Sequence, residues 1–459
     1  MGQKYYAPGS RRFHRRVISN DNGTVADWGF AVRALRSRNY RLFFGGQSVS
    51  LIGTWMTRIA TSWLVYRLTD SPVLLGIVGF AGQAPAFFLG PLAGVWVDRW
   101  DRHRTLVVTQ VLSLLQSFAL AALALLHIIT IWEIVLLSVT QGLINAFDMP
   151  ARQSFVIQMV ENRADLGNAI ALNSSMVNGT RLIGPAIAGV LIAAVGEGWC
   201  FLIDGISYIA VIVSLLSMRI TVAQARTPPR DVLAELYEGW RYVVDSVPIR
   251  SILLLLALVS LVGMPYTVLM PIFASDILHG GAHTLGFLMA ASGVGAFASG
   301  VSLALRKSIV GLGRMIFLSA ALFGAALVAF SLSRTLWLSL ILVPLTGFGM
   351  MQQMAASNTI LQTIVHDEKR GRVMAFYGMA FIGMAPFGSL LAGFLAARIG
   401  APKTLVLGGV LCIAASLWFA RQLPKIREAV RPIYRKLGIL PEIALGVQEA
   451  SLLQTPPEG

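Results

Sequence analysis

The stretch that decides the fold is Gly90-Pro-Leu-Ala-Gly-Val-Trp-Val-Asp-Arg-Trp-Asp-Arg-His-Arg104, in which small and apolar residues lead into a short charged loop. A similar frame returns 210 residues later, over Gly300–Arg314. Two similar halves in parallel order are expected of one architecture of membrane transporter. Further glycine pairs share this spacing or one of about 205 residues: Gly53 and Gly263, Gly76 and Gly286, Gly142 and Gly347, Gly189 and Gly393.

The composition places most of the chain in lipid. Of 459 residues, 56% are hydrophobic and only 13% are charged, and the mean hydropathy is +0.69. A soluble core of this length could not bury so much apolar surface. Stretches of roughly 20 apolar residues, enough to cross about 30 Å of hydrocarbon, recur throughout. We expect twelve spans, at 43–68, 73–97, 105–126, 130–149, 168–195, 199–218, 250–274, 284–305, 314–333, 335–358, 373–397 and 403–420.

The net charge of +15 does not indicate nucleic-acid binding, because the 37 Lys and Arg residues alternate by loop. Most of them lie in the N-terminal segment, the central loop, the C-terminal tail and the loops after even-numbered spans. The positive-inside rule therefore predicts that both termini are cytoplasmic. The N-terminal segment has no apolar run, so we expect no cleavable signal peptide. Cys200 and Cys412 support neither a disulfide framework nor a metal site, and we expect no cofactor.

A single long break between spans divides the chain into two six-span halves. We expect a basic N-terminal segment at 1–42, a first bundle at 43–218, a linker at 219–249, a second bundle at 250–420 and a mobile cytoplasmic tail at 421–459. In the linker, Leu233, Leu236, Trp240 and Val243 lie at helical spacing. This spacing predicts an amphipathic helix in the inner headgroup layer or, equally well, a solvated linker helix.

The charged loop after the second span resembles motif A of the major facilitator superfamily. Gly90 and Gly94 permit close helix approach, and Asp98, Arg99 and Arg102 follow at the cytoplasmic mouth. The resemblance implies an all-α membrane protein with twelve transmembrane helices in two pseudo-symmetric six-helix bundles. It also implies that Asp98 holds the cytoplasmic side shut against the start of the eleventh helix, where a helix N-terminus favours a carboxylate. The alternative is that these charges only set the topology.

Residues of the fourth and fifth spans indicate which branch of the superfamily the chain resembles. Gln141, Asn145, Asp148 and Arg152 share one helical face, which is costly in lipid unless it lines water or meets charged neighbours. With Gly184-Pro185 of the fifth span, these residues resemble the secretion-effector branch, which contains enterobactin exporters and macrolide efflux pumps. We expect gating roles for Asp148, Arg152, Gly184 and Pro185, since the proline and small residues would weaken and bend the fifth span.

Two positions depart from the drug-antiporter pattern. Ser138 stands where that pattern has an arginine, which puts proton coupling through such an arginine in doubt. Ala188 replaces a glycine of the fifth-span signature.

Two arginines lie deep in predicted spans, Arg58 in the first and Arg181 in the fifth. A charged residue at membrane depth is a functional candidate, so we expect a central cavity that attracts anionic or polar, electron-rich substrates. The alternative is that each arginine only pairs with a neighbouring helix. The other candidate substrate-binding residues share these faces or add amide and aromatic surface: Gln47, Thr54, Trp55, Gln141, Asn145, Asn178, Tyr266, Gln353, Tyr377 and Phe381.

Acidic residues at depth are scarce, and Asp204 in the sixth span is the clearest. Proton antiport needs a group that titrates as access alternates, so Asp204 is our candidate for proton coupling. It could instead pair with Arg181 or reach water in the outer leaflet. His279 and His283 are flanked by Gly280 and Gly281, which favours a loop over a zinc site.

Together these features predict a secondary transporter of the cytoplasmic (inner) membrane, not an enzyme. It would export small amphiphilic compounds, drug-like or siderophore-like, by alternating access and proton antiport. Its partners would be the bilayer, a small-molecule substrate and protons, with no nucleic acid, and we expect a monomer. An uptake carrier with the same fold and a non-transporting sensor or scaffold are the alternatives. The Gly184-Pro185 pattern favours export, and a scaffold has no reason to bury Arg58 and Arg181.

Overall fold

The computed structural model describes residues 32–219, 232–306 and 308–436, and these residues are helical with no strand among them. The short helices η1 (Arg33–Arg36) and η2 (Arg163–Asp165) precede two of the long ones. The first half contains α2 (Arg38–Thr69), α3 (Pro72–Ala81), α4 (Ala84–Arg99), α5 (Arg102–Leu125), α6 (Ile131–Met159), α7 (Leu166–Val195) and α8 (Glu197–Leu216).

A linker helix, α9 (Val232–Asp245), leads into the second half. That half contains α10 (Val247–Leu258), η3 (Val259–Gly263), α11 (Tyr266–Ile272), η4 (Phe273–Ile277), α12 (Ala282–Ala304), α13 (Leu312–Leu332), α14 (Leu336–Ile364), α15 (Asp367–Gly378), η5 (Met379–Gly383), α16 (Met384–Ile399) and α17 (Ala401–Lys436).

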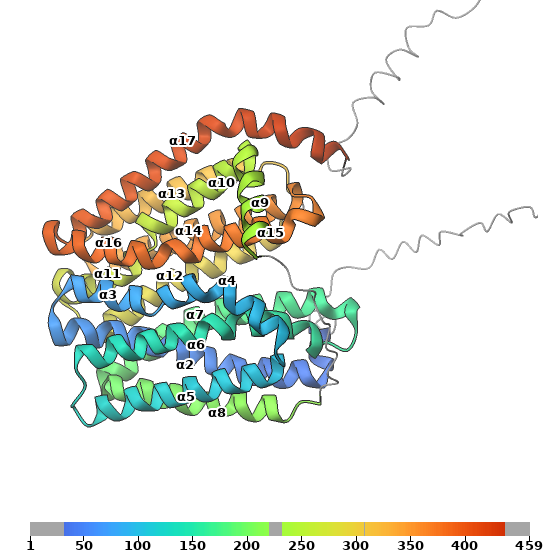
Figure 1. The fold of residues 1–459 in the computed structure, drawn as a ribbon. Helices are drawn as coiled ribbons and strands as arrows, with labels where there is room; N and C mark the ends of the chain where they lie inside the picture. Colours follow the sequence, from blue (N-terminus) through green and yellow to red (C-terminus); the bar gives the residue numbers. More distant parts are fainter. Residues whose placement is uncertain (1–31, 220–231, 307, 437–459) are drawn as a thin grey trace, which may run out of the picture.

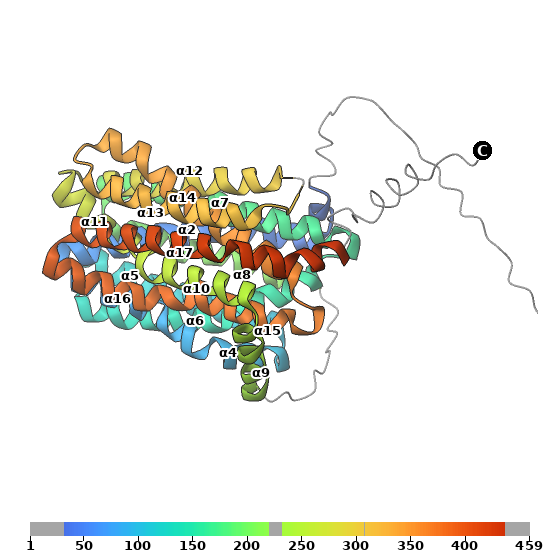
Figure 2. The ribbon, with the colours of Figure 1, turned by 90° about the horizontal axis from the view of Figure 1, so that it is seen from above.

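The two halves form two layers of roughly aligned helices (Figure 1). The first helix begins at Arg33 and the last ends at Lys436 at the same end of the bundle, on the right in Figure 1, and we name this the terminal end. The other end carries the turns from α2 to α3, from α7 to α8 and from η4 to α12, and we name it the far end. The linker helix α9 lies toward the terminal end and projects to one side (Figure 2).

Eleven helical stretches in the described part of the chain are long and apolar enough to cross a membrane. The remaining predicted span, the first along the chain, is α2, which has 32 residues and packs along α7 and α8 inside the first half. Its length of about 48 Å is sufficient. It is less apolar than the others because it carries Arg58 and several polar residues, the same residues that we predicted to face a cavity.

Three of the predicted spans are interrupted near prolines. The second divides into α3 and α4 before Pro85, the seventh contains the π-helical turns η3 and η4, and the eleventh contains the π-helical turn η5 before Pro386. Proline removes a backbone donor, and π-turns mark places where a helix is bent. The twelfth span is longer than expected, since α17 passes the predicted end at 420 and continues to Lys436.

Close glycine contacts repeat between the halves. A Cβ atom on Gly76 of α3 would lie 3.1 Å from the Cα of Gly393 on α16, and one on Gly189 of α7 would lie 2.8 Å from the Cα of Gly286 on α12. In the sequence repeat, Gly76 corresponds to Gly286 and Gly189 to Gly393, so the two contacts are equivalent. The glycines therefore permit the halves to approach closely on both sides of a pseudo-twofold axis.

The halves are closed against each other toward the far end. The main contacts between them join α7 to α12 and α3 to α16, and the four glycines just described lie in the far-end parts of these helices. Toward the terminal end, Phe87 of α4 still touches Gly383 of η5.

Candidate functional site

The first cluster lies where α2 meets α7. Gly184 leaves room for Trp55, since a Cβ on this glycine would lie 2.5 Å from the Trp55 Cβ. The guanidinium carbon of Arg58 lies 4.9 Å from the centroid of the Trp55 ring, and that of Arg181 lies 5.8 Å from it. The indole is therefore within cation–π distance of two guanidinium groups.

The two guanidinium groups are accessible, and no carboxylate of the described residues compensates their charge. Arg58 is exposed and Arg181 is partly exposed, although both lie in the middle of long helices. They repel each other, and neither forms an ion pair with a carboxylate of the described residues. An arginine at the bilayer centre costs about 2.5–3.5 kcal/mol on insertion scales. The cluster is therefore suited to contact with water or with a bound anion, not with lipid.

Polar groups of α7 continue from this cluster toward the terminal end. Asn178 donates a hydrogen bond of 2.9 Å to the carbonyl of Ser174, and Ser174 is exposed. On α2, Thr54 donates to the carbonyl of Ser50 at 3.0 Å, whereas Gln47 is only 2% exposed. Thus Arg58, Arg181 and Asn178 are accessible together, and Gln47 is enclosed in this conformation.

The polar stripe of α6 divides into two parts. Gln141 donates to Ser113 and to Asn145, at 3.3 and 3.2 Å, and both Gln141 and Asn145 are half-buried. Asp148 is 3% exposed and accepts hydrogen bonds from the side chains of Thr109 (2.9 Å) and Gln110 (2.8 Å) on α5. It also forms an ion pair with Arg152, one turn further along α6. The acidic end of the stripe therefore ties α6 to α5.

Asp204 joins three helices of the first half. Its Oδ2 accepts hydrogen bonds from Thr57 of α2 at 2.8 Å and from Ser117 of α5 at 3.0 Å. Its Oδ1 is buried and has no hydrogen-bond partner among the described residues. Gly53 of α2 makes room for this oxygen, because a Cβ there would lie 2.6 Å from it. Arg181 is not among the partners of Asp204.

Candidates from the second half are mostly enclosed in this conformation. Tyr266 is fully buried, its hydroxyl lies 2.6 Å from that of Ser292, and its ring packs edge-on against Phe323. Gln353 is 1% exposed, with a buried Nε2 that lacks a hydrogen-bond partner among the described residues. The other two also form internal contacts: Tyr377 donates to the carbonyl of Met354 at 3.1 Å, and the carbonyl of Phe381 accepts from Ser260.

The predicted latch is only partly described. The backbone of Asp98 belongs to α4, but its side chain lies outside the described residues. Arg99 is exposed, and Arg102 begins α5 after Asp101, whose side chain accepts from the backbone N–H of Arg104 at 3.1 Å.

The start of α15, the expected partner of this latch, is attached to the linker helix. Arg372 lies 2.6 Å from Glu238 of α9, and Lys369 forms an ion pair with the same carboxylate. Hydrogen bonds from Lys369 and then Arg372 hold the pKa of Glu238 below its usual range. The rings of Trp240 and Phe376, 6.1 Å apart, extend the attachment.

Sequence reasoning missed the contacts that close the far end. Tyr66 of α2 donates a hydrogen bond of 2.5 Å to Asp276 of η4, which joins the two halves. The two residues are 210 positions apart, the spacing of the repeat. Repeat-related residues that touch must lie beside the pseudo-twofold axis, so the repeat itself carried a signal that could have identified this pair.

Aromatic rings also cross the seam between the halves. Phe387 of α16 lies 5.9 Å from Phe80, 5.4 Å from Phe87 and 6.3 Å from Phe88, with edge-to-face geometry in each case. Such pairs stabilise a contact beyond the area that they bury.

Comparison with known proteins identifies the class of protein that this fold and seam define. Residues 30–449 match the family model described as "Transmembrane secretion effector", and the chain belongs to this family. It is a multi-pass membrane transporter of the major facilitator superfamily and not an enzyme.

Among characterised relatives, the chain is 27% identical to the staphyloferrin A transporter of Staphylococcus aureus, over 84% of this chain and 97% of that protein. It is 27% identical to the multidrug efflux pump Tap of Mycolicibacterium fortuitum, over 82% and 93% of the two chains. It is 22% identical to macrolide efflux protein A of Streptococcus pyogenes, over 82% and 95%.

Two solved structures share the fold at low identity. The nucleoside transporter NupG superposes with a TM-score of 0.65 at 12% identity, over 84% of this chain and 99% of that one. A bacterial homologue of the human lysosomal transporter Spinster, inward-facing and occupied, also gives a TM-score of 0.65, at 14% identity over 86% and 98%.

Proposed function

We propose that this transporter exports a small amphiphilic compound with an anionic group, by alternating access and in exchange for protons. The observation that carries the proposal is that the guanidinium groups of Arg58 and Arg181 are accessible, lie near the Trp55 ring and are not paired with a carboxylate of the described residues. Guanidinium forks bind carboxylate and other oxyanions by paired, charge-assisted hydrogen bonds. The indole adds a flat apolar surface for the rest of the compound.

Export is supported by the closed far end and the distribution of charge. The positive-inside rule assigns the terminal end to the cytoplasm. With the far end closed by Tyr66–Asp276 and the glycine contacts, this conformation would admit cargo from the cytoplasm. Two of the relatives are named as efflux proteins. We infer that this is the state that loads cargo before export and that the cytoplasmic membrane is its location.

Proton coupling is assigned to Asp204. The carboxyl group is 1% exposed, receives two hydroxyl donors on Oδ2 and has an unpartnered Oδ1. A buried carboxylate without a cation is costly, whereas a proton on Oδ1 removes the charge. Thr57 belongs to α2, which also carries Arg58. Loss of this proton would therefore change a hydrogen bond made by the helix that binds cargo.

The opposite state would be closed on the terminal side by the motif A latch. In that state we propose that Asp98 lies beside the start of α15, while the Gly184-Pro185 segment of α7 accommodates the movement. Asp148 and Arg152 would hold α5 and α6 together as the first half moves as a unit. Because one chain supplies both halves of the seam, a monomer suffices for this cycle.

The test has two stages. Purified protein is first screened by thermal shift against antibiotics, dyes, and catecholate and carboxylate siderophores, because a ligand of the folded state raises its melting temperature. Each hit is then offered to energised inverted membrane vesicles. Accumulation inside them that stops when the pH gradient is collapsed is the expected result. Accumulation only in right-side-out vesicles would indicate uptake and contradict the proposal.

Asp204→Asn separates binding from coupling. The amide keeps the size of the side chain but cannot exchange a proton at this oxygen. We expect the variant to bind the hit with parental affinity and to lose accumulation driven by the pH gradient. Gradient-driven accumulation at the parental rate in this variant would remove Asp204 from the proton pathway.

A further inference from the structure

The last helix is longer than the membrane requires. α17 has 36 residues, which gives a length of about 54 Å, whereas about 20 residues cross the hydrocarbon core. Its first part, from Ala401, packs along α13 and α10. The residues after about 420 therefore extend past the hydrocarbon at the terminal end, where Figures 1 and 2 show the end of α17.

This extension has one face fixed against the protein. Ile426, Val430 and Tyr434 are 4%, 5% and 9% exposed and belong to the main hydrophobic core. Their spacing of four residues places them along one side of the helix. The rotation of the extension is therefore set by packing, and the directions of its other side chains are set with it.

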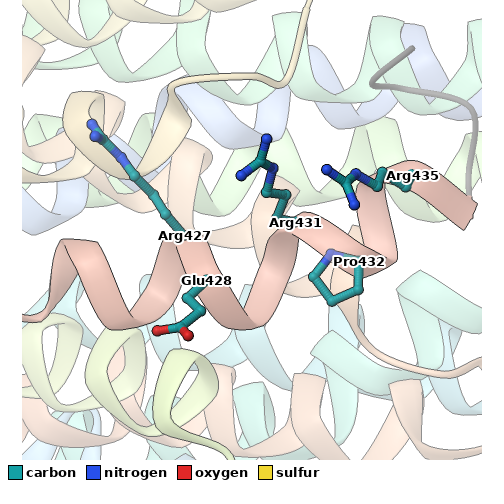
Figure 3. A pocket seen from close by; sticks show the side chains of 5 residues that line it. All are labelled: Arg427, Glu428, Arg431, Pro432 and Arg435. Carbon is teal, nitrogen blue, oxygen red and sulfur yellow. The ribbon is translucent and has the colours of Figure 1, made fainter. Parts of the chain in front are cut away.

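Three arginines form a row beside the buried face. Arg427, Arg431 and Arg435 follow each other at intervals of four residues, and all three are exposed. They line a shallow hollow together with Glu428 and Pro432, and Figure 3 shows the three guanidinium groups on one side of the helix and the Glu428 carboxylate on the other. We name Arg427, Arg431 and Arg435 the arginine row.

No carboxylate of the described residues forms an ion pair with the arginine row. None of its members forms an ion pair or a hydrogen bond with another described residue. Elsewhere, Arg67 pairs with Glu197 and Arg372 with Glu238. Like charges one helical turn apart repel each other, so an anion supplied from outside the described residues would stabilise the row.

We propose that the arginine row binds the phosphate groups of anionic membrane lipids. A guanidinium fork matches the geometry of phosphate oxygens, and a basic segment just outside the hydrocarbon lies at the depth of the headgroups. Each arginine in this position contributes about 5-fold to the affinity for an anionic lipid. Free phosphate has the same oxygen atoms but no acyl chains. In a bound lipid, the acyl chains would lie beside the apolar part of α17.

The experiment compares two variants of the full-length protein with equal loss of charge. The test variant carries Arg427→Gln with Arg431→Gln, and the control carries Arg421→Gln with Lys425→Gln, from the same extension but outside the row. Native mass spectrometry in one detergent measures the binding of phosphatidylglycerol, phosphatidylcholine and inorganic phosphate. All four substituted side chains are exposed, so the fold should persist, and Arg431→Gln alone serves as a milder variant.

The expected result is tighter binding of phosphatidylglycerol than of phosphatidylcholine to the parent protein. The test variant should lose roughly 25-fold in affinity for phosphatidylglycerol, Arg431→Gln about 5-fold, and the control variant less than 2-fold. Equal losses in test and control variants would show a diffuse effect of net charge and overturn the proposal. Equal binding of phosphatidylcholine, or displacement of the lipid by equimolar inorganic phosphate, would also overturn it.

Discussion

Replacing Tyr66 by Phe should open the far end more often. The substitution deletes one hydroxyl, which donates to Asp276 across the two halves at 2.5 Å. A hydrogen bond to a charged acceptor contributes about 1.5–3 kcal/mol. The bond exists only when the far end is closed, so its loss should raise the ratio of open to closed molecules by about 10- to 150-fold.

The assay is the modification rate of a cysteine hidden in the closed seam. Ser389→Cys suits this purpose, because Ser389 is 2% exposed and lies against Gly76 and Gly79 of the other half. The native Cys200 and Cys412 are fully buried and give little background. A water-soluble maleimide should react faster in Tyr66→Phe by the factor above, since the rate follows the open population.

Tyr266→Phe is the matched control for this measurement. It also deletes a buried tyrosine hydroxyl, but the partner, Ser292, belongs to the same half. The modification rate should therefore stay at the parental value. If Tyr66→Phe leaves the rate unchanged, or if Tyr266→Phe raises it as much, the Tyr66–Asp276 bond does not hold the far end closed.

Three further predictions concern the seam and its two ends. Asp98→Asn should leave folding intact but slow efflux, and unchanged efflux kinetics in a well-expressed variant would remove the latch. Gly189→Ala should speed modification of Ser389→Cys, because the new Cβ would lie 2.8 Å from Gly286, whereas Gly90→Ala, with open space around it, should not. The pKa of Glu238 is lowered by Lys369 and Arg372, so the attachment of α9 to α15 should be complete above the ordinary value of 4.5 and weaken only as the pH falls below it. The rate of hydrogen exchange of residues 237–245 should rise in the parent protein below that pH. In Glu238→Gln the rate should already be raised at pH 7, and equal exchange in parent and variant at pH 7 would contradict this.

The repeat and most helix positions could be predicted because their signals are local. Apolar runs and glycine spacing fix where a span begins and where helices approach closely. The structure bears out the repeat in detail, since Gly142 packs on the carbonyl of Gly82 much as Gly347 packs on that of Ser292, its repeat equivalent.

Helix ends near prolines and charges were less predictable. α6 continues through Pro150 to Met159, and α17 continues through Pro424 and Pro432 to Lys436. Proline and basic residues are ordinary signs of a helix end, but in α17 the buried Ile426, Val430 and Tyr434 provide tertiary contacts that outweigh them.

Partners of charged side chains depend on which helices meet, and this information is not local. Glu238 belongs to a segment whose helical spacing was recognised, yet nothing in that spacing indicates α15 as its neighbour. The accessible positions of Arg58 and Arg181 agree with the predicted cavity, and their role in binding cargo stays a prediction.

The central claim is that these two arginines bind the cargo. The most direct measurement is the dissociation constant of a transported compound for the parent, Arg58→Gln, Arg181→Gln and Arg306→Gln. Among the described residues, the exposed Arg306 bonds only to its own loop and to Met315. Loss of a charge-assisted contact of about 1.5–3 kcal/mol predicts affinity 10- to 150-fold weaker in the first two variants and unchanged in the third. Parental affinity in both Arg58→Gln and Arg181→Gln would contradict the account.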